Sequence, residues 1–234
     1  MTIRYAIGDV HGESDRLARL HDAIMAHHVL EGGDALLVHV GDLIDRGPNS
    51  RGVVKRVMEM EAEPPPNMKV ACVMGNHEQM LLEAMRKDDR SQCGFWFDQG
   101  GDKTIESYER VNGVGNPWHS AVDRAHVAWL SSLPSMIRDA HCVFVHGGID
   151  PARFPECPDD LRLWTRSQKF FDEARWPHRQ ELKNILVVHG HTPTNDALPE
   201  VSRRRINIDT GVCYGGPLTC VVLIPGERPR FLGA

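Results

Sequence analysis

Short, mostly apolar runs that each contain β-branched residues recur along the chain, and each of the first four ends at a polar, glycine-containing motif. These runs cover residues 3–7, 35–40, 69–74 and 142–145. Runs of this length bounded by glycine are typical of buried β-strands. We therefore expect four strands, each followed directly by polar residues at its carboxyl end, where open α/β sheets place their functional sites.

Between these runs, apolar residues at helical spacing predict helices. The first follows Ser14, which can cap it, and stops at Gly32. Residues 48–50 open a second helix that the prolines at 64–66 close, and a third is expected after residue 77. The resulting alternation of strand and helix is typical of an α/β fold.

Residues 88–139 show a different pattern, with three tryptophans, several glycines and no β-like alternation. We expect a helical flank over roughly residues 78–140, beside the ends of the strands. The flank is interpreted either as an ordinary packing region or as a wall that selects the substrate.

The last third of the chain returns to strand-like runs at residues 185–188, 206–208 and 218–224, and we expect the last two to be antiparallel. A second sheet packed against the first would give a central β-sandwich of two mixed sheets flanked by helices, an α/β class that some schemes name α+β. Because the polar motifs are spread along most of the chain, a split would separate them. We therefore expect one domain over residues 1–234.

The composition limits the possible partners. The 234 residues are 41% hydrophobic and carry a formal net charge of −5. This balance argues against general binding of nucleic acid or of an anionic membrane surface. The basic run at residues 203–205 is interpreted as a solvated approach to a strand, or as a contact to an anion or a partner.

The N-terminal residues enter a strand-like run without the layout of a signal peptide, and no apolar stretch is long enough for a membrane-spanning helix. We therefore expect a cytoplasmic protein. The six cysteines include no C-x-x-C pair, so free thiols are expected rather than a disulfide framework.

The first polar motif, G-D-V-H-G, places an acid and a histidine at the end of the first predicted strand. Asp9 and His11 are two positions apart, so in an extended segment both project from one side and can share a metal ion. The flanking glycines let the backbone approach an ion or a phosphate closely. Taken alone, the motif fits a metal site and ordinary turn chemistry equally well.

The second motif, G-D-L-I-D-R-G, adds two acids and an arginine. The two oxygens of Asp42 can bridge a pair of cations. The planar guanidinium of Arg46 suits bidentate binding of phosphate. Asp45 is well placed to orient a nearby histidine through a ring nitrogen.

Three later motifs complete the set. Asn76 offers an amide oxygen as a ligand, which leaves the adjacent His77 free to donate a proton to a leaving alkoxide. His146 and His191 each end an apolar run and lie beside glycine, so both can bind a second ion. Five such motifs in this order predict one site for two metal ions.

Two further histidines are candidates for a supporting role. His39 lies within a predicted strand, and His189 lies two residues before a predicted ligand, so either can contact the ligands from behind. The other histidines are interpreted as hydrogen-bonded core or surface residues: His21, His27, His28, His119, His126, His141 and His178.

These residues, in this order, resemble the phosphoprotein phosphatase family of the calcineurin-like metallophosphoesterases, and more closely its bacterial and phage-type serine/threonine phosphatases. The resemblance covers most of the chain. It extends to L-W-T-R at residues 163–166, to D-T-G at 209–211 and to Y-G-G-P-L-T at 214–219. The fold that it implies is the calcineurin-like one, a central β-sandwich flanked by helices.

The resemblance also implies a role for each residue. Six residues would bind two metal ions, with Asp42 as the bridge between them: Asp9, His11, Asp42, Asn76, His146 and His191. Four would act on the substrate, namely His77 as general acid, Asp45 as its partner, and Arg46 and Arg166 as a phosphate clamp.

The reaction that the resemblance implies is hydrolysis of a phosphomonoester, in which a hydroxide bridging the two ions attacks phosphorus directly. A ligand set of nitrogen and oxygen atoms admits Mn, Fe or Zn, and the resemblance favours Mn²⁺. The implied substrates are a phosphoprotein, at serine or threonine, or a small phosphoester. The oligomeric state stays open.

Two other functions also stay open. Symmetrical dinucleoside tetraphosphate hydrolases share the D-x-H, D-x-x-x-R and N-H motifs, so hydrolysis of diadenosine tetraphosphate or another nucleotide is the alternative. The intact Asp45–Arg46 pair, Glu78 and the Y-G-G-P-L-T segment favour the protein phosphatase. An inactive, protein-binding scaffold would be expected to have lost ligands or the general acid, and all of them are present.

Overall fold

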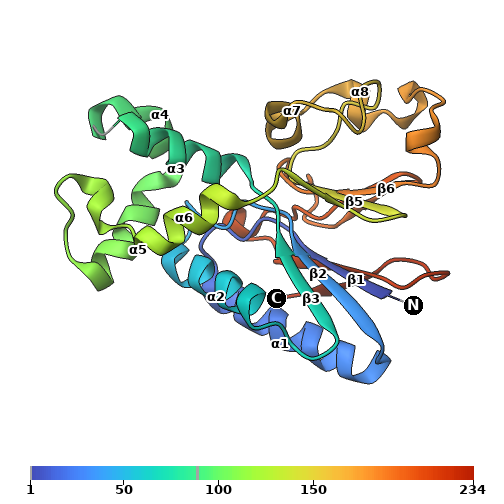
Figure 1. Ribbon diagram of the computed structural model, residues 1–234, viewed down its shortest axis with the longest axis horizontal. Coiled ribbons are helices and arrows are strands. Elements are labelled where there is room, and N and C mark those ends of the chain that lie inside the picture. The colour runs from blue at the N-terminus through green and yellow to red at the C-terminus, as the bar shows by residue number, and fades with distance from the viewer. Residues whose placement is uncertain (1, 88–89) are drawn as a thin grey trace.

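The structure is a computed structural model that describes residues 2–87 and 90–234. Figure 1 shows two sheets stacked face to face, with helices outside each sheet and a further group of helices at one end. Each sheet has five strands in the described part of the chain. The predicted sandwich of two mixed sheets flanked by helices is confirmed.

The first sheet contains the early strands that the sequence predicts. In spatial order it is formed by β10 (Arg230–Gly233), β9 (Thr219–Leu223), β1 (Thr2–Ile7), β2 (Asp34–His39) and β3 (Met68–Cys72). β1, β2 and β3 are parallel, and Ile7 lies opposite His39, which in turn lies opposite Cys72. Because these three strands end level with one another, the motifs that follow them leave the sheet side by side.

The second sheet repeats this arrangement with later strands. In spatial order it is formed by β4 (Met136–Arg138), β5 (Cys142–Val145), β6 (Leu186–His189), β8 (Arg205–Asn207) and β7 (Glu200–Val201). β5, β6 and β8 are parallel, and the two outer strands are antiparallel to their neighbours. The motifs after β5 and β6 therefore also leave from one edge.

Two long helices, α1 (Ser14–Glu31) and α2 (Ser50–Ala62), cover the outer face of the first sheet. The side chain of Asn49 caps α2 by accepting a hydrogen bond from the Gly52 N–H at 3.0 Å. The predicted cap of α1 is wrong, because Ser14 is already the first helical residue and its hydroxyl instead accepts a hydrogen bond from Asn49 Nδ2.

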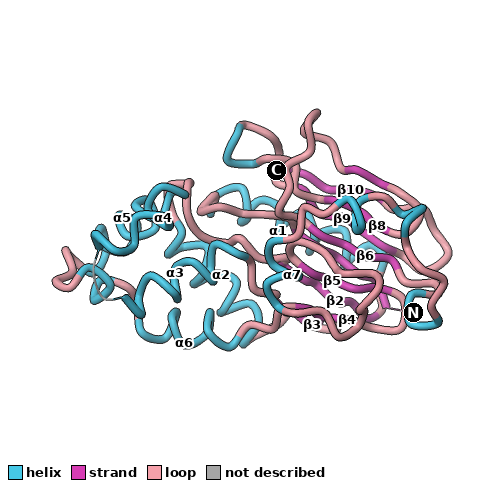
Figure 2. Tube along the Cα trace, turned by 90° about the horizontal axis from the view of Figure 1, so that it is seen from above, coloured by secondary structure: helices cyan, strands magenta, loops and turns pink. Residues whose placement is uncertain are grey.

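The predicted helical flank forms the group of helices at one end of the molecule, which Figure 2 shows beside the strands. Residues 88 and 89 of that prediction lie outside the described residues. Its elements are α3 (Asn76–Lys87), η1 (Arg90–Cys93), α4 (Gly94–Trp96), η2 (Phe97–Gly101), α5 (Asp102–Asn112), η3 (Trp118–Ala121) and α6 (Arg124–Ser132). The expected absence of β structure before residue 142 is wrong, because β4 lies within the predicted range.

Short helices cover the outer face of the second sheet (Figure 1). They are α7 (Asp159–Trp164), α8 (Gln168–Phe171), η4 (Glu173–Arg175) and η5 (Gln180–Leu182), and a further short helix, η6 (Val212–Tyr214), precedes β9. Phe170 and Trp176 stack at 5.9 Å and pack with the strand residues Val143 and Val187.

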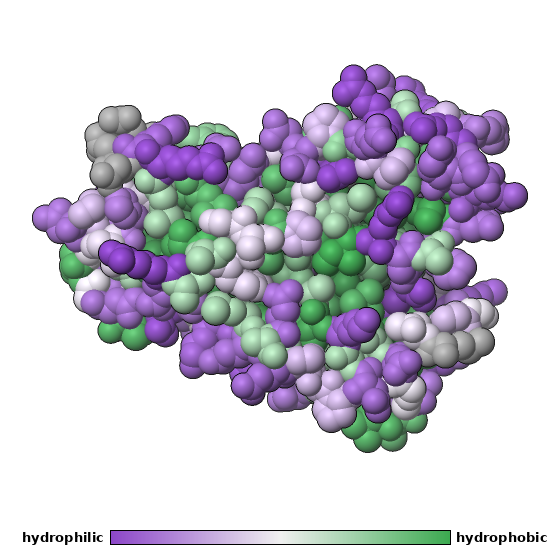
Figure 3. All heavy atoms as spheres, in the orientation of Figure 1, coloured by the Kyte–Doolittle hydropathy of each residue, from purple (hydrophilic) through white to green (hydrophobic). Residues whose placement is uncertain are grey.

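The space between the sheets is filled by apolar side chains from both. They form one cluster of buried residues: Ala6, Val38, Val40, Val73, Cys142, Phe144, Val188, Ile206, Ile208, Val221 and Leu223. On the face shown in Figure 3, hydrophilic side chains dominate the outer ends and apolar ones gather along the middle. Burial of both inner faces fixes the sheets against each other, and with them the strand ends that carry the motifs.

Two further expectations about the C-terminal third are corrected. The strands β8 and β9 do not pair with each other, because the segment between them passes from the second sheet to the first. β9 instead pairs antiparallel with β1 and β10, and β10 was not predicted. Arg205 of the basic run is not solvated, since it is buried and pairs with Glu200.

All six cysteines are free, as predicted. Within residues 2–87 and 90–234, the helices are too short or too polar to cross a membrane.

Candidate active site

The predicted ligands lie in the segments that directly follow parallel strands of both sheets. The first sheet carries four of them after β1, β2 and β3, and the second sheet carries two after β5 and β6. All six are buried: Asp9, His11, Asp42, Asn76, His146 and His191. Two groups of possible metal ligands occur in the described part of the chain, and they share one residue.

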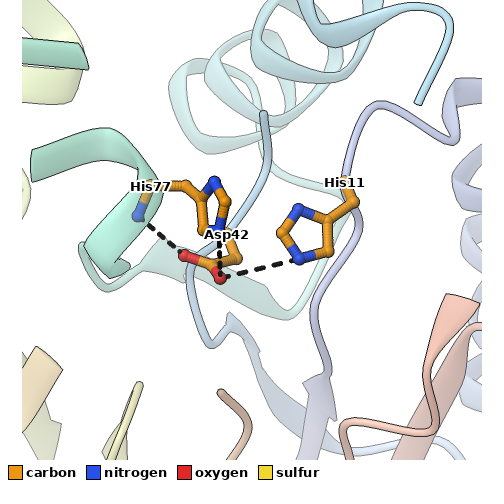
Figure 4. A group of neighbouring side chains, drawn as sticks. All are labelled: His11, Asp42 and His77. Carbon is orange, nitrogen blue, oxygen red and sulfur yellow. Dashed lines mark hydrogen bonds and ion pairs between the residues drawn. The ribbon is translucent and has the colours of Figure 1, made fainter. Parts of the chain in front are cut away.

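The first group consists of His11, Asp42 and His77, which Figure 4 shows facing one another. Their ligand-type atoms all lie within 4.8 Å of one another. Asp42 Oδ2 is 3.7 Å from His11 Nε2 and 3.8 Å from His77 Nε2. The backbone N–H of His77 also donates to Asp42 Oδ1 at 3.1 Å, so the start of α3 holds this carboxylate in place.

The second group consists of Asp42, His146 and His191. Asp42 Oδ1 is 3.2 Å from His146 Nε2. The amide oxygen of Asn76 lies 2.9 Å from His146 Nε2 and 2.8 Å from His191 Nδ1. Asp42 thus belongs to both groups, which is the position that a bridging ligand needs.

Asp9 belongs to neither group of three. Both of its carboxylate oxygens accept a hydrogen bond from the His191 N–H at 3.2 Å. Burial and the neighbouring Asp209 raise the pKa of Asp9 well above its ordinary value. A cation beside Asp9 would relieve this repulsion between acids, so the carboxylate is a candidate ligand on electrostatic grounds.

The chemistry of the donor atoms fits divalent metal ions. His11 Nδ1 donates to the Ile44 carbonyl at 2.9 Å and His146 Nδ1 donates to the Val40 carbonyl at 2.8 Å, so both Nε2 atoms face Asp42. Burial lowers the pKa of His11 to about 3, which keeps its ring neutral and able to bind a metal. Burial opposes protonation of His146 too, but Asp42 raises its pKa to about 10, which indicates that the site favours a positive charge.

A buried hydrogen-bond network surrounds the predicted proton donor. His77 Nδ1 donates to Asp45 Oδ2 at 2.6 Å. Burial would lower the pKa of His77, but Asp42 and Asp45 outweigh it and raise that pKa. Burial raises the pKa of Asp45, and hydrogen bonds from His77, Thr104 and Trp96 oppose that rise. The pair therefore has the geometry and charge of a general acid with its orienting carboxylate.

Both predicted phosphate-binding arginines line one cavity of about 260 Å³ together with Asp42, Asn76, His77 and His191. Arg46 Nη1 donates to His11 Nε2 at 2.9 Å, so its positive charge lies against the first group of ligands. Arg166 is exposed at the cavity and donates to the His191 carbonyl at 3.4 Å. The outer wall is aromatic, with Phe95 from the helical group and Trp164 and Tyr214 from the other side.

Comparison with known proteins decides the family. A family model described as calcineurin-like phosphoesterase matches residues 5–219. The chain belongs to the calcineurin-like phosphoesterase family. The predicted family is thereby confirmed, and with it the reaction class, hydrolysis of phosphoester bonds.

Three curated relatives of this calcineurin-like phosphoesterase carry names of two kinds, protein phosphatase and nucleotide hydrolase. A serine/threonine-protein phosphatase 1 of Salmonella typhimurium is 37% identical over 92% of this chain and 89% of its own length. An asymmetrical bis(5'-nucleosyl)-tetraphosphatase of Halalkalibacterium halodurans is 28% identical over 95% of this chain and 94% of its own. A Shewanella-like protein phosphatase 1 of Plasmodium berghei is 31% identical over 70% of this chain, and the match spans 43% of that relative.

A solved structure supports the fold of the calcineurin-like phosphoesterase. The crystal structure of a cold-active protein-tyrosine phosphatase from a psychrophilic Shewanella has a TM-score of 0.65 to this chain, at 20% identity. It covers 98% of this chain, and this chain covers 80% of it. The likeness at this identity concerns the fold alone.

Sequence reasoning missed several residues around the centre of this calcineurin-like phosphoesterase. Trp96 Nε1 and Thr104 Oγ1 both donate to Asp45, although they are 51 and 59 residues away in the chain. Asp209 lies beside Asp9, and burial raises its pKa to about 6. The signal for Asp209 was present, since it follows a strand as the other acids do, whereas nothing local marks Trp96 or Thr104.

The two histidines expected behind the ligands lie elsewhere. His39 Nε2 is 2.9 Å from His21 Nε2, on the side of the first sheet that faces α1. His189 Nδ1 donates to the adjacent Gly190 carbonyl, and its ring packs on Phe170 and Phe171. Neither makes a hydrogen bond to a predicted ligand among the contacts that the structure describes. Strand alternation turned both side chains away from the site.

Proposed function

We propose that the protein is a metal-dependent phosphomonoesterase that removes phosphate from serine or threonine residues of phosphoproteins. The observation that carries this proposal is the meeting of three features at one small cavity: the two ligand groups around Asp42, the Asp45–His77 pair and the two arginines. The similarity to the Salmonella protein phosphatase over most of both chains supports the choice of substrate.

We assign six residues to two divalent ions: Asp9, His11, Asp42, Asn76, His146 and His191. When bound, such ions lower the pKa of water and stabilise the negative charge on the phosphoryl group. The nitrogen and oxygen donors suit Mn²⁺, Fe or Zn²⁺, and we propose Mn²⁺ as the activating ion.

The remaining four residues act on the substrate. Arg46 and Arg166 bind the phosphoryl oxygens and orient the ester, since a guanidinium matches phosphate with paired N–H groups. His77 donates its proton to the leaving oxygen, and Asp45 holds the imidazole in the orientation for that transfer. A cation bound to His11 would replace the hydrogen bond from Arg46, and Arg46 also lines the cavity, where its guanidinium would meet the phosphoryl oxygens.

The extent of the site supports one functional unit over residues 1–234, because both sheets supply ligands. The cytoplasmic location expected from the sequence stays a prediction. So does the absence of nucleic acid and membrane from its partners.

A second candidate is hydrolysis of dinucleoside polyphosphates, favoured by the similarity to the Halalkalibacterium tetraphosphatase over nearly all of both chains. The cavity of about 260 Å³ is below the range of about 300–1,000 Å³ that is usual for sites enclosing a whole small molecule. It therefore suits the phosphorylated end of a larger substrate better than an entire dinucleotide.

The deciding experiment compares rates on phosphoserine and phosphothreonine peptides with the rate on diadenosine tetraphosphate, using the Mn²⁺-loaded protein. We expect kcat/KM for the peptides to be at least about tenfold higher, a difference of about 1.4 kcal/mol in transition-state stabilisation. A faster reaction with diadenosine tetraphosphate would instead assign the second function. Asp42→Asn serves as the control for contaminating phosphatases, since it removes the shared ligand.

A further inference from the structure

The carboxylate of Asp45 is held on every side by groups from other elements. Trp96 Nε1 donates to Oδ2 at 2.8 Å, and Thr104 Oγ1 donates to Oδ1 at 2.6 Å. His77 Nδ1 shares Oδ2 with Trp96. Asp45 and Thr104 are completely buried and Trp96 is 2% exposed, so these oxygens are shielded from bulk solvent.

The backbone of Asp45 is fixed by the same segment. Its N–H donates to Thr104 Oγ1 at 2.9 Å and to Ser50 Oγ at 3.0 Å. Asp45 has a φ of 72°, in the left-handed region that non-glycine residues rarely adopt. A residue in this conformation needs outside contacts to keep it there, and Thr104 binds both its backbone and its side chain.

The next residue, Arg46, is held by the turn between Trp96 and Thr104. Its φ is 66°, and its N–H donates to the Gly100 carbonyl at 3.1 Å. Gly100 itself has a φ of 98°, and a Cβ atom there would lie 2.8 Å from the Arg46 backbone nitrogen and 2.9 Å from its Cγ. Only glycine therefore allows this turn to approach Arg46 so closely.

The helical group gives this segment a rigid base. The Trp96 ring lies against Gly101, where a Cβ atom would be 2.3 Å from the indole, and its centroid is 5.4 Å from that of Trp118. Trp118 Nε1 is buried without a hydrogen-bond partner among the described residues. The indole rings of Trp96 and Trp118 pack together, but only the N–H of Trp96 donates a hydrogen bond to an active-site residue.

We propose that residues 96–104 are a positioning element for the Asp45–Arg46 pair, with Trp96 and Thr104 orienting the Asp45 carboxylate toward His77 and Gly100 setting the place of Arg46. This inference rests on the proposed function, because it assumes that His77 donates a proton and that Arg46 binds phosphate. The helical group is then part of the reaction machinery rather than only a wall beside it.

The first test separates proton donation from folding. Trp96→Phe removes the N–H to Asp45 but keeps an aromatic ring, and Trp118→Phe removes an N–H that has no partner. The Mn²⁺-loaded variants are assayed with phenyl phosphate, a poor leaving group, and with para-nitrophenyl phosphate, a good one. We expect Trp96→Phe to lower kcat about tenfold on phenyl phosphate and less than about threefold on para-nitrophenyl phosphate, with KM unchanged.

Several outcomes of this test overturn the role of Trp96. They are an equal loss on both substrates, the same selective loss in Trp118→Phe, or a wild-type rate in Trp96→Phe. His77→Asn gives the reference pattern for a lost proton donor. If Trp96→Phe does not fold, Thr104→Val and Thr104→Ser decide in the same way: only the valine, which lacks the hydroxyl, is expected to show the selective loss.

The second test addresses Arg46. Gly100→Ala places a methyl group against Arg46, so we expect KM to rise about tenfold on both substrates and binding of inorganic phosphate, measured by calorimetry, to weaken by a similar factor. The dependence on the leaving group is expected to stay as in the wild type. Gly113→Ala, at a φ of 83° with open space around it, is the matched control. Unchanged phosphate binding in Gly100→Ala would refute the placement of Arg46 by this turn.

Different results would refute the proposed function and the positioning element. A wild-type protein without metal-dependent phosphomonoesterase activity would refute the proposed function. An active wild type whose Trp96, Thr104 and Gly100 variants behave like their controls would refute the positioning element alone.

Discussion

At the scale of single residues, the candidate site stands out by its backbone. Eight non-glycine residues in the described part of the chain have positive φ, and five of them are predicted site residues: His11, Asp42, Asp45, Arg46 and His191. Such conformations cost of order 1–3 kcal/mol each and persist only where neighbouring contacts hold them. Contacts from neighbouring segments must therefore hold the backbone at these five residues in place.

The sequence could predict which residues meet at this site but not how they are held. Residues of the right chemistry follow each predicted strand, and parallel strands that end together bring them to one place. The left-handed conformation of Arg46 has no signal in its residue type, and aspartate at position 45 is only a weak one, because aspartate adopts this region more often than most residues but not as a rule. The contacts from Trp96 and Thr104 depend on a packing between distant segments that no spacing along the chain encodes.

A buried histidine pair outside the site gives the protein a pH-dependent stability. Burial lowers the pKa of His21 to about 2 and that of His39 to about 4, against about 6.5 in the unfolded chain. The unfolded chain therefore binds more protons at these two histidines between pH 6.5 and 4, so their contribution to stability is complete above pH 6.5 and is lost as the pH falls through this window. We expect each of the two histidines to lower the free energy of unfolding by about 2 kcal/mol as the pH falls from 7 to 5.

Urea denaturation at pH 7 and pH 5 measures this contribution. Between pH 7 and pH 5, the free energy of unfolding of His21→Gln is expected to fall by about 2 kcal/mol less than that of the wild type. His178→Gln removes an exposed histidine and is expected to keep the wild-type dependence. An identical pH dependence in the wild type and His21→Gln would show that the pair is not held neutral.

At the scale of secondary-structure elements, one side chain joins the start of α3 to the loop after β2. The carboxylate of Glu78 accepts hydrogen bonds from the N–H groups of Asp42 and Gly75 at 2.9 Å and of Leu43 at 2.8 Å. Glu78 is completely buried. The Glu78 carboxylate therefore binds both the loop that supplies Asp42 and the residue directly before the Asn76–His77 pair.

Replacing the Glu78 carboxylate tests whether it holds the loop after β2 and the start of α3 together. In Glu78→Gln an amide NH₂ faces backbone N–H groups, which leaves buried donors unpaired. We expect a loss of about 1–3 kcal/mol in unfolding free energy. Burial and Asp42 raise the pKa of Glu78 to about 7, so the measurement belongs at pH 8, where the wild-type side chain is ionised. Glu83→Gln, exposed on the same helix, is the control, and an equal change in both variants would contradict the account.

The elements themselves were largely predictable, and the errors have one physical source. Strands buried on both faces and helices with a regular apolar stripe give strong local patterns, which identified β1 to β3, α1 and α2. Partners of strands are set by the path of the chain in space. For that reason β8 and β9 were wrongly paired, and the short edge strands β4, β7 and β10 went unrecognised.

At the scale of the whole molecule, the candidate metal centre lies where the two sheets meet. Asp9 and Asp42 follow strands of the first sheet, and His146 and His191 follow strands of the second. Burial and Asp209 raise the pKa of Asp9, and Asp42 outweighs burial to raise that of His146, so the junction requires positive charge. Metal ions bound there would join the sheets directly.

This arrangement predicts that metal stabilises the entire fold rather than one loop. Mn²⁺ at about a hundred times its Kd would add about 2.7 kcal/mol, because it binds the folded chain and not the unfolded one. For a chain of this size that corresponds to a rise in Tm of about 5–10 °C over the chelator-treated protein, measured by calorimetry. Asp42→Asn should abolish the rise, whereas Asp22→Asn, which neutralises an exposed acid on α1, should keep it. A chelator-treated protein that melts at the same temperature with and without Mn²⁺ would show that the two sheets are not joined through a metal.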